Sequence, residues 1–414
     1  MFYRFWLYIK SPEKTLWVQP ALGALFAIVF ATLGFVAKYF LPLDLLPNID
    51  ATTLDDLLDI IATSMLAVST FSLSIMVAAF ASASNNATPR ASKLVMADKD
   101  ARMAIASFIS SFIYAAVAKT ATGLGYYDQN GRFVLFAATI LILLYLIITL
   151  IRWVHTLSLL GRLSTTIDKI RVAALNALKD YRQDYYYGAC ASPPKGAVKT
   201  RICGHKVGYL VHIDFKQLQE LAQEYEVHFH IQHRPGKLLY GGECLVEVYG
   251  QDLDNERQQK VLEAFILGRM RTYEQDARFG LIVLSEVAQR ALSPSVNDPG
   301  TAIQILAVIA ELLIEPEKNE EQSPRYANLS MVALEEADLI AHPIAPIARD
   351  GANNIEVGVC LQKVLAGIYQ RGYEKGVRAE AKHQAKRALE LAQKALILQE
   401  DYQILEKLHR QLFN

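Results

Sequence analysis

The distribution of apolar residues divides the chain into two parts. Four segments in the first 155 residues are long and apolar enough to cross a hydrocarbon core of about 30 Å, which takes about 20 helical residues. They lie at residues 17–40, 59–84, 104–124 and 133–153. The second is clear because nothing charged lies between Asp59 and Arg90, and the fourth has 19 uncharged residues before Arg152. The pattern predicts a domain of four transmembrane helices over residues 1–160.

After residue 160 the pattern becomes that of a water-soluble protein. Helical periodicity continues the fourth span to about residue 185, and a segment with a tyrosine triplet and two prolines then interrupts it. We therefore expect a helical link and linker over residues 161–195. Strand-like and helical stretches alternate over 196–252, which predicts a small α+β module. Residues 253–414 are predicted to be mainly helical.

Several helix starts in this second part are marked by a capping residue. Asp214 precedes an amphipathic run over residues 215–225, and Asp254 precedes a predicted helix over 256–267. Near the C-terminus one apolar stripe follows helical spacing, which predicts a helix that packs through small side chains, on its own domain or, alternatively, against another copy of the chain. The stripe consists of Val377, Ala381, Ala385, Ala388, Ala392 and Leu396.

The charges of the short loops predict the orientation of the spans, because Lys and Arg resist translocation. Three cations, Arg4, Lys10 and Lys14, precede the first span, whereas the following loop carries only acidic charges. Cations return after the second span and again after the fourth. Both termini are therefore predicted to be cytoplasmic. The expected fold is a membrane protein with four transmembrane α-helices followed by a cytoplasmic α+β domain rich in helices.

Composition supports this division and excludes some classes of protein. Residues 1–160 hold 11 Lys and Arg and 9 Asp and Glu, whereas residues 161–414 hold 31 and 33. The net charge of zero excludes the surplus of cations that a nucleic-acid binder needs, so we expect no nucleic-acid partner. The four cysteines form no CxxC pair, which indicates neither a disulfide scaffold nor a cysteine zinc site.

The second span carries small and hydroxyl side chains at spacings of three and four residues, and these share one helix face. The candidate pore-lining residues on this face are Thr63, Thr70, Ser74 and Asn85, with alanines between them. One interpretation is close helix–helix packing, which favours small residues in lipid. The other is a passage lined by hydroxyl groups. Close packing and a polar passage are compatible in an oligomer, because the same face can pack in one state and line a passage in another.

Charged residues gather near the predicted outer ends of the second and third spans. Lys119 interrupts the third span, and Asp59 begins the second at the same predicted level. Lys119 is expected either to extend to the interface or to pair with Asp59. The alternative is an outer charged ring of Asp55, Asp56, Asp59 and Lys119, whose acidic groups would favour cations at a pore mouth.

One motif in the predicted cytoplasmic region separates two helices. It contains Ser293, Pro294, Asn297, Asp298, Pro299 and Thr301. Asp298 suits an N-cap and Pro299 suits the first helical position, where the missing N–H costs nothing. An amide and a carboxylate at an exposed helix start could also bind a ligand or a cation. The histidines at 205, 212, 228, 230 and 233 lack an acid or cysteine at ligand spacing, so no metal site is predicted.

Three sequence blocks resemble one known family. The first contains Phe71-Ser72-Leu73 and runs to Thr88-Pro89-Arg90, and the second is Pro235-Gly236. The third and most specific contains Phe279-Gly280 and the segment 291–302. Together they resemble the bacterial predicted membrane protein family catalogued as domain of unknown function 2254, along nearly the whole chain. Residues 84–88 depart from the family's bulkier, glutamine-containing stretch. The resemblance implies a bacterial inner-membrane location and a paired membrane and cytoplasmic domain, and it supplies no catalytic residues.

No nucleophile elbow, phosphate loop, kinase signature or HExxH motif is present, so we expect no enzyme. The sequence does not identify a cofactor. A membrane hydrolase built on Asp298 or Asp350 is a minor alternative. The favoured hypothesis is an oligomeric ion channel or transport protein gated by its cytoplasmic domain. The alternative is a non-conducting membrane scaffold or sensor that binds a cytoplasmic partner or ligand. The expected partners are the lipid bilayer and further copies of the chain.

Overall fold

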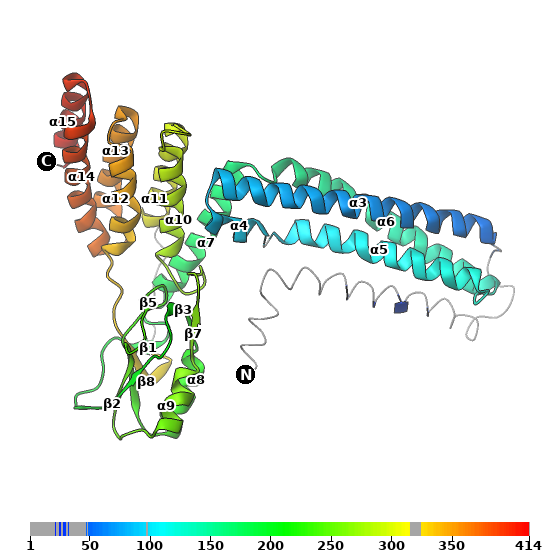
Figure 1. Ribbon diagram of the computed structural model, residues 1–414, viewed down its shortest axis with the longest axis horizontal. Helices are drawn as coiled ribbons and strands as arrows, with labels where there is room; N and C mark the ends of the chain where they lie inside the picture. The colour runs from blue at the N-terminus through cyan, green and yellow to red at the C-terminus, as the bar shows by residue number, and fades with distance from the viewer. Residues whose placement is uncertain are drawn as a thin grey trace. The chain divides into compact units, whose positions relative to one another are not determined.

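The computed structural model describes residues 21, 25, 28, 29, 32, 47, 49–96, 98–314 and 324–413. The chain divides into two compact units, Met1–Thr166 and Ile167–Asn414, which we call the N-terminal unit and the C-terminal unit. Figure 1 shows long helices in the first unit, and strands together with shorter helices in the second.

The described part of the N-terminal unit is built from three long helices and one short helix. The long helices are α3 (Ala51–Asn86), α5 (Lys99–Gly123) and α6 (Gln129–Leu159), and the short one is α4 (Pro89–Met96). Each long helix is apolar and long enough to cross a membrane. They contain the second, third and fourth predicted spans. The first, residues 17–40, lies outside the described residues except for isolated positions, so the count of four spans stays a prediction.

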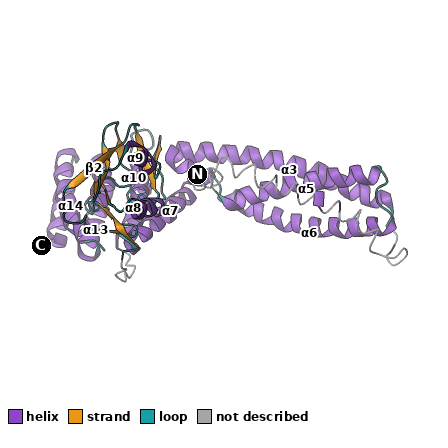
Figure 2. Ribbon diagram, turned by 90° about the horizontal axis from the view of Figure 1, so that it is seen from below, coloured by secondary structure: helices purple, strands orange, loops and turns teal. Residues whose placement is uncertain are grey.

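Each long helix begins at an aspartate that caps it. Asp98 accepts a hydrogen bond of 2.9 Å from the backbone N–H of Ala101, and Asp128 accepts one of 2.8 Å from Gly131. Asp50 accepts from the N–H of Thr52 in the same way. These bonds satisfy N–H groups that have no partner within the helix. The three helices run side by side, as Figure 2 shows from below.

The helix expected to continue the fourth span is interrupted at Gly161. Helix α6 ends at Leu159, and a separate helix, α7 (Leu163–Gln183), follows after a short turn. Gly161 adopts a φ of +78°, a left-handed conformation that only glycine adopts without a Cβ penalty. Its carbonyl accepts a hydrogen bond of 3.1 Å from the hydroxyl of Ser82 on α3. The backbone of this turn is therefore held in place, and the two helices are not continuous.

The described strands of the C-terminal unit form two sheets. The first has the order β1-β8-β4-β6-β2, and the second has the order β5-β3-β7. The bounds of the first are β1 Ala189–Cys190, β8 Tyr326–Met331, β4 His228–Ile231, β6 Cys244–Tyr249 and β2 Val198–Cys203. Those of the second are β5 Leu238–Leu239, β3 Gly208–Ile213 and β7 Phe265–Gly268. Strand β8 pairs in parallel with β1 and β4, and the other pairs are antiparallel.

Two local expectations differ from the structure here. The helix expected over 256–267 is α9 (Asn255–Leu262), and Phe265–Gly268 forms strand β7 instead. The segment expected to be a linker contributes strand β1, and Tyr187 stacks on Phe215 at a centroid distance of 5.6 Å. Both strands are stabilised by pairing partners and aromatic contacts that are distant in the chain. The local periodicity of the sequence carries no information about these contacts.

Helix α8 (Phe215–Glu224) packs on the five-stranded sheet through Phe215, Leu218 and Ala222, which are buried. Asp214 caps it as predicted, accepting a hydrogen bond of 3.0 Å from Gln217. Phe229 and Ile231 of β4 point into this core, whereas His228 and His230 alternate to the other face and are half-buried. The sheet therefore has one apolar face against a helix and one polar face.

The remaining helices of the C-terminal unit form two layers. Helices α10 (Phe279–Ala291), α12 (Asp338–Asp350) and α14 (Lys375–Ala395) contact one another in order. Helices α11 (Pro299–Ile314), α13 (Ile355–Arg371) and α15 (Gln399–Phe413) form the second layer. The predicted apolar stripe of α14 is buried from Val377 to Ala392, which confirms that face. Figure 1 shows these helices standing side by side.

Candidate functional site

The candidate pore-lining residues lie on the exposed face of α3. Thr63, Thr70, Ser74 and Asn85 are exposed, whereas the face buried against α5 and α6 lies on the other side of the helix. The buried face consists of Leu54, Leu58, Ile61, Met65, Ser69, Ser72, Met76, Ala79 and Ala83. At 100° per residue the two sets are centred almost opposite each other. The hydroxyl face therefore does not form the packing contact of α3 with its described neighbours.

The hydroxyl groups of this face donate to the backbone of α3 itself. Thr63 donates to the carbonyl of Asp59 at 2.7 Å, Thr70 to that of Ala67 at 2.9 Å, and Ser74 to that of Thr70 at 3.0 Å. Each oxygen keeps its lone pairs free to accept. The exposed face is therefore a row of acceptor oxygens between small side chains.

Large apolar residues flank this row on both sides. Leu66, Leu73 and Val77 are exposed along one edge, and Ile60 and Phe71 along the other. Such side chains suit contact with lipid tails, whereas the polar row between them does not. The polar row is thus narrow and has apolar side chains on both sides, as expected for a surface that contacts another protein or lines a water-filled passage.

The predicted outer ring is partly brought together. Lys119 of α5 and Asp59 of α3 form an ion pair, as one of the two sequence interpretations expected, with both side chains partly exposed. Asp56 is exposed, and one carboxylate oxygen of Asp55 is buried with no hydrogen-bond partner in the described structure. The N-terminal end of α3 therefore presents the carboxylates of Asp55, Asp56 and the N-cap Asp50 besides the one that pairs with Lys119.

The motif between α10 and α11 has the geometry of a helix N-cap. Asp298 accepts hydrogen bonds from the backbone N–H of Thr301 at 3.1 Å and from its hydroxyl at 2.5 Å. The hydrogen bond from the Thr301 hydroxyl, and after it the one from the Thr301 backbone N–H, hold the pKa of Asp298 below its usual value. Asn297 has a φ of +48°, which reverses the chain just before Pro299 starts the helix. Pro294 and Asn297 are exposed, whereas Ser293 donates to the carbonyl of Arg290.

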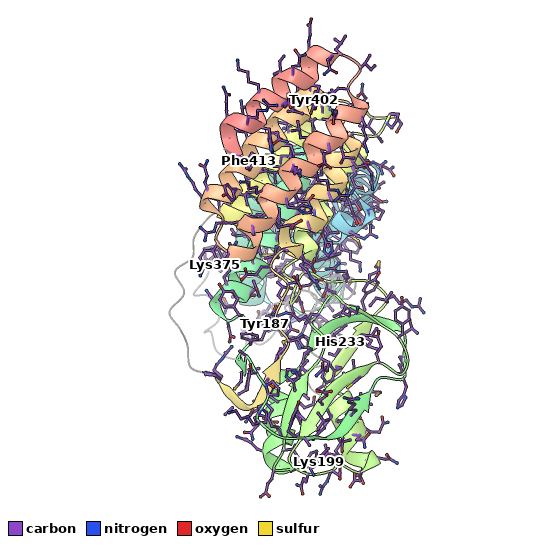
Figure 3. All side chains as sticks on the ribbon, turned by 90° about the vertical axis from the view of Figure 1, so that its left-hand side faces the viewer. Tyr187, Lys199, His233, Lys375, Tyr402 and Phe413 are labelled. Atoms are coloured by element: carbon purple, nitrogen blue, oxygen red, sulfur yellow. The ribbon has the colours of Figure 1, made fainter. Side chains whose placement is uncertain are left out.

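A buried polar network joins the helices and sheets of the C-terminal unit. Arg234, on the loop after β4, donates to the carbonyls of Val332 at 3.0 Å and Tyr185 at 2.8 Å. Its guanidinium lies 5.5 Å from the ring centroids of both Tyr181 and Tyr187. Burial lowers the pKa of Arg234 and raises that of Tyr187 to about 12. Figure 3 shows Tyr187 at the level where the helices meet the strands.

An acidic residue extends the network toward α10. Asp276 lies between Arg271, whose Nε donates to it at 2.7 Å, and Arg278, which pairs with Asp338 of α12 at 3.0 Å. Burial raises the pKa of Asp276, and the two arginines oppose that shift. Gly236 approaches this carboxylate so closely that a Cβ would lie 2.1 Å from its Oδ2. The Pro235-Gly236 block is therefore packed against a buried charge.

A third set of polar groups lies on the polar face of the five-stranded sheet. The hydroxyl of Ser330, which is fully buried, lies 2.9 Å from His228 Nε2 and 2.9 Å from His230 Nδ1. Burial lowers the pKa of both histidines, and the neighbouring Glu247 opposes that shift at His230. Within the described residues, no three His, Cys, Asp or Glu side chains lie close enough to hold a metal ion.

The sequence interpretation missed the buried polar groups of the C-terminal unit, although a further one, Arg182, was visible in the sequence. Arg182 occupies the next position of the apolar stripe that runs through Ile170, Ala174 and Leu178 of α7. Its side chain is buried and pairs with Glu374 at 2.9 Å. A cation on an apolar stripe indicates a buried ion pair, but its partner lies 192 residues away and nothing in the sequence identifies it.

Comparison with known proteins gives a family and no activity. The family model described as "Predicted membrane protein (DUF2254)" matches residues 13–367. Uncharacterized proteins of Mycobacterium tuberculosis and Mycobacterium bovis are each 25% identical over 323 residues, covering 71% of this chain and 59% of each relative. The match thus spans about three fifths of the length of these curated relatives. No solved structure matches the chain significantly.

Proposed function

The chain belongs to the DUF2254 family of predicted membrane proteins, and from that premise we propose that it is an oligomeric ion channel or transport protein. It would lie in the bacterial inner membrane with both termini cytoplasmic, and its C-terminal unit would gate it. The observation that supports this proposal is the exposed polar row on α3, on the side opposite its packing face.

The length of the row fits a membrane passage. Thr63 and Asn85 are 22 residues apart, which corresponds to about 33 Å of helix, and a hydrocarbon core is about 30 Å thick. The hydroxyl groups of the row donate to carbonyls of α3, but in lipid their acceptor lone pairs and the Asn85 amide would find no partner, which is unfavourable. Copies of α3 arranged around an axis would remove the row from lipid and place its acceptor oxygens along a common path.

The charges at the N-terminal end of α3 support a preference for cations. Lys119 balances Asp59, which leaves Asp50, Asp55 and Asp56 as acidic charges at this end of α3. Acceptor oxygens along the path and carboxylates at its mouth both attract cations. Only Leu160, Gly161 and Arg162 separate α6 from α7, so the covalent connection from the spans to a gating unit is short.

Recordings of the purified full-length protein in planar bilayers test this function. We expect a cation conductance that changes several-fold in Thr70→Val and Ser74→Ala. Thr149→Val is the matched control, because Thr149 is a partly exposed threonine of α6 whose hydroxyl also donates to a carbonyl of its own helix. Absence of conductance under voltage, membrane tension and varied ionic conditions would contradict the proposal. So would equal conductance of the row variants and the wild type.

A second candidate function is a non-conducting scaffold or sensor that binds a cytoplasmic partner or ligand. It is favoured by the hydroxyl groups of the row, since their bonds to α3 carbonyls also suit a dry helix–helix contact. Native mass spectrometry of the protein in detergent distinguishes the two. An oligomer that Ser74→Leu dissociates, together with no conductance, would support the second function.

A further inference from the structure

Strands β2 and β6 place two cysteines opposite each other. Cys203 ends β2, Cys244 begins β6, and the two are direct partners in the antiparallel ladder. Directly opposed residues in such a ladder lie on the same face of the sheet. Both cysteines are free thiols and both are half-exposed.

The backbone around the pair fits a cross-strand disulfide. The adjacent Gly204 donates its N–H to the carbonyl of Glu243 at 2.9 Å. The register shifts between Ile202 and Cys203, where Leu245 has no partner in β2, and Cys203–Cys244 is the rung beyond this bulge. Directly opposed residues of an antiparallel ladder have Cα atoms about 4.5–5.5 Å apart, and disulfides join Cα atoms about 4.4–6.8 Å apart. The spacing of opposed residues in the ladder is therefore within the range that a disulfide bridges.

The two sulfur atoms lean in the same direction along the ladder. Cys203 Sγ lies 3.9 Å from the carbonyl oxygen of Arg201, and Cys244 Sγ lies 3.5 Å from that of Val246. Arg201 and Val246 belong to neighbouring rungs of the same ladder. Both thiols therefore lean toward the same stretch of the sheet, and the Cys203 sulfur is near enough to contribute to the raised pKa of Cys244.

We propose that Cys203 and Cys244 form a reversible disulfide in response to oxidised low-molecular-weight thiols. The Cys203 thiolate attacks one sulfur of a small disulfide, such as glutathione disulfide, and expels one thiolate. Cys244 then loses its proton to water and attacks the Cys203 sulfur, which expels the second thiolate. Two electrons pass from the cysteines to the small disulfide, and the two protons end on the two released thiols.

The environment of Cys244 assigns the order of these steps. Burial, followed by the nearby Cys203 sulfur, raises the pKa of Cys244 to about 11. Cys244 is therefore a poor first nucleophile, because the thiolate is the reactive form. It becomes effective once Cys203 carries the mixed disulfide, since the second attack is intramolecular.

The bond would fix an edge of the five-stranded sheet. Strand β2 is the last strand in the order β1-β8-β4-β6-β2, and within the described residues β6 is its only ladder partner. A covalent link at the end of the ladder would hold β2 against β6 even when the hydrogen bonds between the two strands open. Oxidation would therefore rigidify this edge of the C-terminal unit. The proposal does not depend on whether the protein conducts ions.

The test uses purified full-length protein in detergent, equilibrated with mixtures of glutathione disulfide and glutathione. Free thiols are then alkylated, and the digested peptides are analysed by mass spectrometry. We expect one disulfide per chain joining the peptides of Cys203 and Cys244, reversed by dithiothreitol. Cys190 and Cys360 should remain alkylated, because the ladder places Cys190 opposite Ser330, and Cys360 lies in α13.

Variants separate this pair from random oxidation. Cys203→Ser should leave Cys244 alkylated, whereas Cys190→Ser and Cys360→Ser should leave the disulfide unchanged. The proposal is wrong if excess glutathione disulfide produces no Cys203–Cys244 link in the folded protein while the urea-unfolded chain forms one. It is also wrong if Cys203 pairs as often with Cys190 or Cys360. These measurements on the wild-type chain remain decisive even if a serine variant misfolds.

Discussion

The guanidinium Nε of Arg182 lies 2.9 Å from the carboxylate of Glu374, and both side chains are at most 1% exposed. The guanidinium also lies 4.9 Å from the ring centroid of Tyr373. The pair joins the last turn of α7 to the residue that precedes α14. It therefore connects two elements that are far apart in the chain through charges that water does not reach.

Breaking this pair should destabilise the C-terminal unit strongly. Arg182→Met leaves Glu374 buried without its cation, and removing one partner of a buried pair costs about 3–5 kcal/mol. Urea unfolding of the full-length protein in detergent, followed by circular dichroism, measures the loss. Arg410→Met is the control, because Arg410 is 68% exposed in its pair with Glu406 and should change stability by less than about 1 kcal/mol. Equal effects of the two substitutions would contradict the role of burial.

Gly280→Ala should be destabilising although alanine favours helices. A Cβ at Gly280 of α10 would lie 2.4 Å from the Cβ of Ala174 and 2.7 Å from its Cα. The close crossing of α7 and α10 would have to open, at a cost of about 1–3 kcal/mol. Thermal unfolding should show the loss, and Ala174→Gly added to it should restore part of the stability.

Gly367 provides the matched control for this crossing. It lies inside α13, and a Cβ there would meet its nearest neighbour, Ile314, at an ordinary 3.6 Å. Gly367→Ala should therefore be neutral or slightly stabilising, because alanine has the higher helix propensity. Destabilisation of Gly367→Ala as large as that of Gly280→Ala would mean that the close contact is not the cause.

Asp298→Ala should lower stability by about 1 kcal/mol, because the first turn of α11 loses its cap. The pKa of Asp298 is lowered in the folded protein. Its contribution is therefore present above the unfolded pKa of about 3.9 and is lost as the pH falls through the lower folded value. Urea unfolding at several acidic pH values checks this dependence.

Asp350→Ala is the control for the cap. Asp350 is the last residue of α12 and pairs with the exposed side chain of Arg349. We expect its loss to change stability by less than about 1 kcal/mol. If Asp298→Ala instead leaves stability unchanged and removes a measured activity, the motif is a binding site and not mainly a cap.

The C-terminal unit should lose stability below about pH 6.5 through His228 and His230. The pKa of both is lowered by burial, so below the unfolded value of about 6.5 the unfolded chain binds more protons than the folded one. Stability therefore falls as the pH decreases from about 6.5, and this contribution is constant above it. Comparing urea unfolding at pH 7.5 and pH 5.5 measures the change.

Removing the two histidines should reduce that pH dependence. His228→Gln combined with His230→Gln keeps polar groups near Ser330 but takes up no proton. His383→Gln is the control, because His383 is 65% exposed. An unchanged pH dependence in the double variant would show that other groups cause the loss of stability.

Much of the local structure was predictable because its causes are local. Apolar runs located three of the long helices, and aspartates such as Asp214 and Asp298 fixed where helices begin. Capping depends on residues within one turn, so the sequence contains all that is needed. The membrane assignment likewise depends on length and apolarity alone.

The strands and their partners were harder to predict. Phe265–Gly268 follows a helix directly and has no distinctive pattern, yet it pairs with β3. Strand β8 follows a long helical segment and enters the sheet between β1 and β4. A short strand is stabilised by its neighbours, and these come from distant parts of the chain.

The sequence by itself determined where apolar helices lie, which aspartates cap helices, and which face of α3 is polar. Only the tertiary structure decided that this face lies opposite the packing face, that Arg182 meets Glu374, and that Cys203 lies opposite Cys244. The reason is physical. Helix periodicity and capping are interactions between residues close in the chain, whereas strand register and buried charge pairing depend on which distant segments pack together.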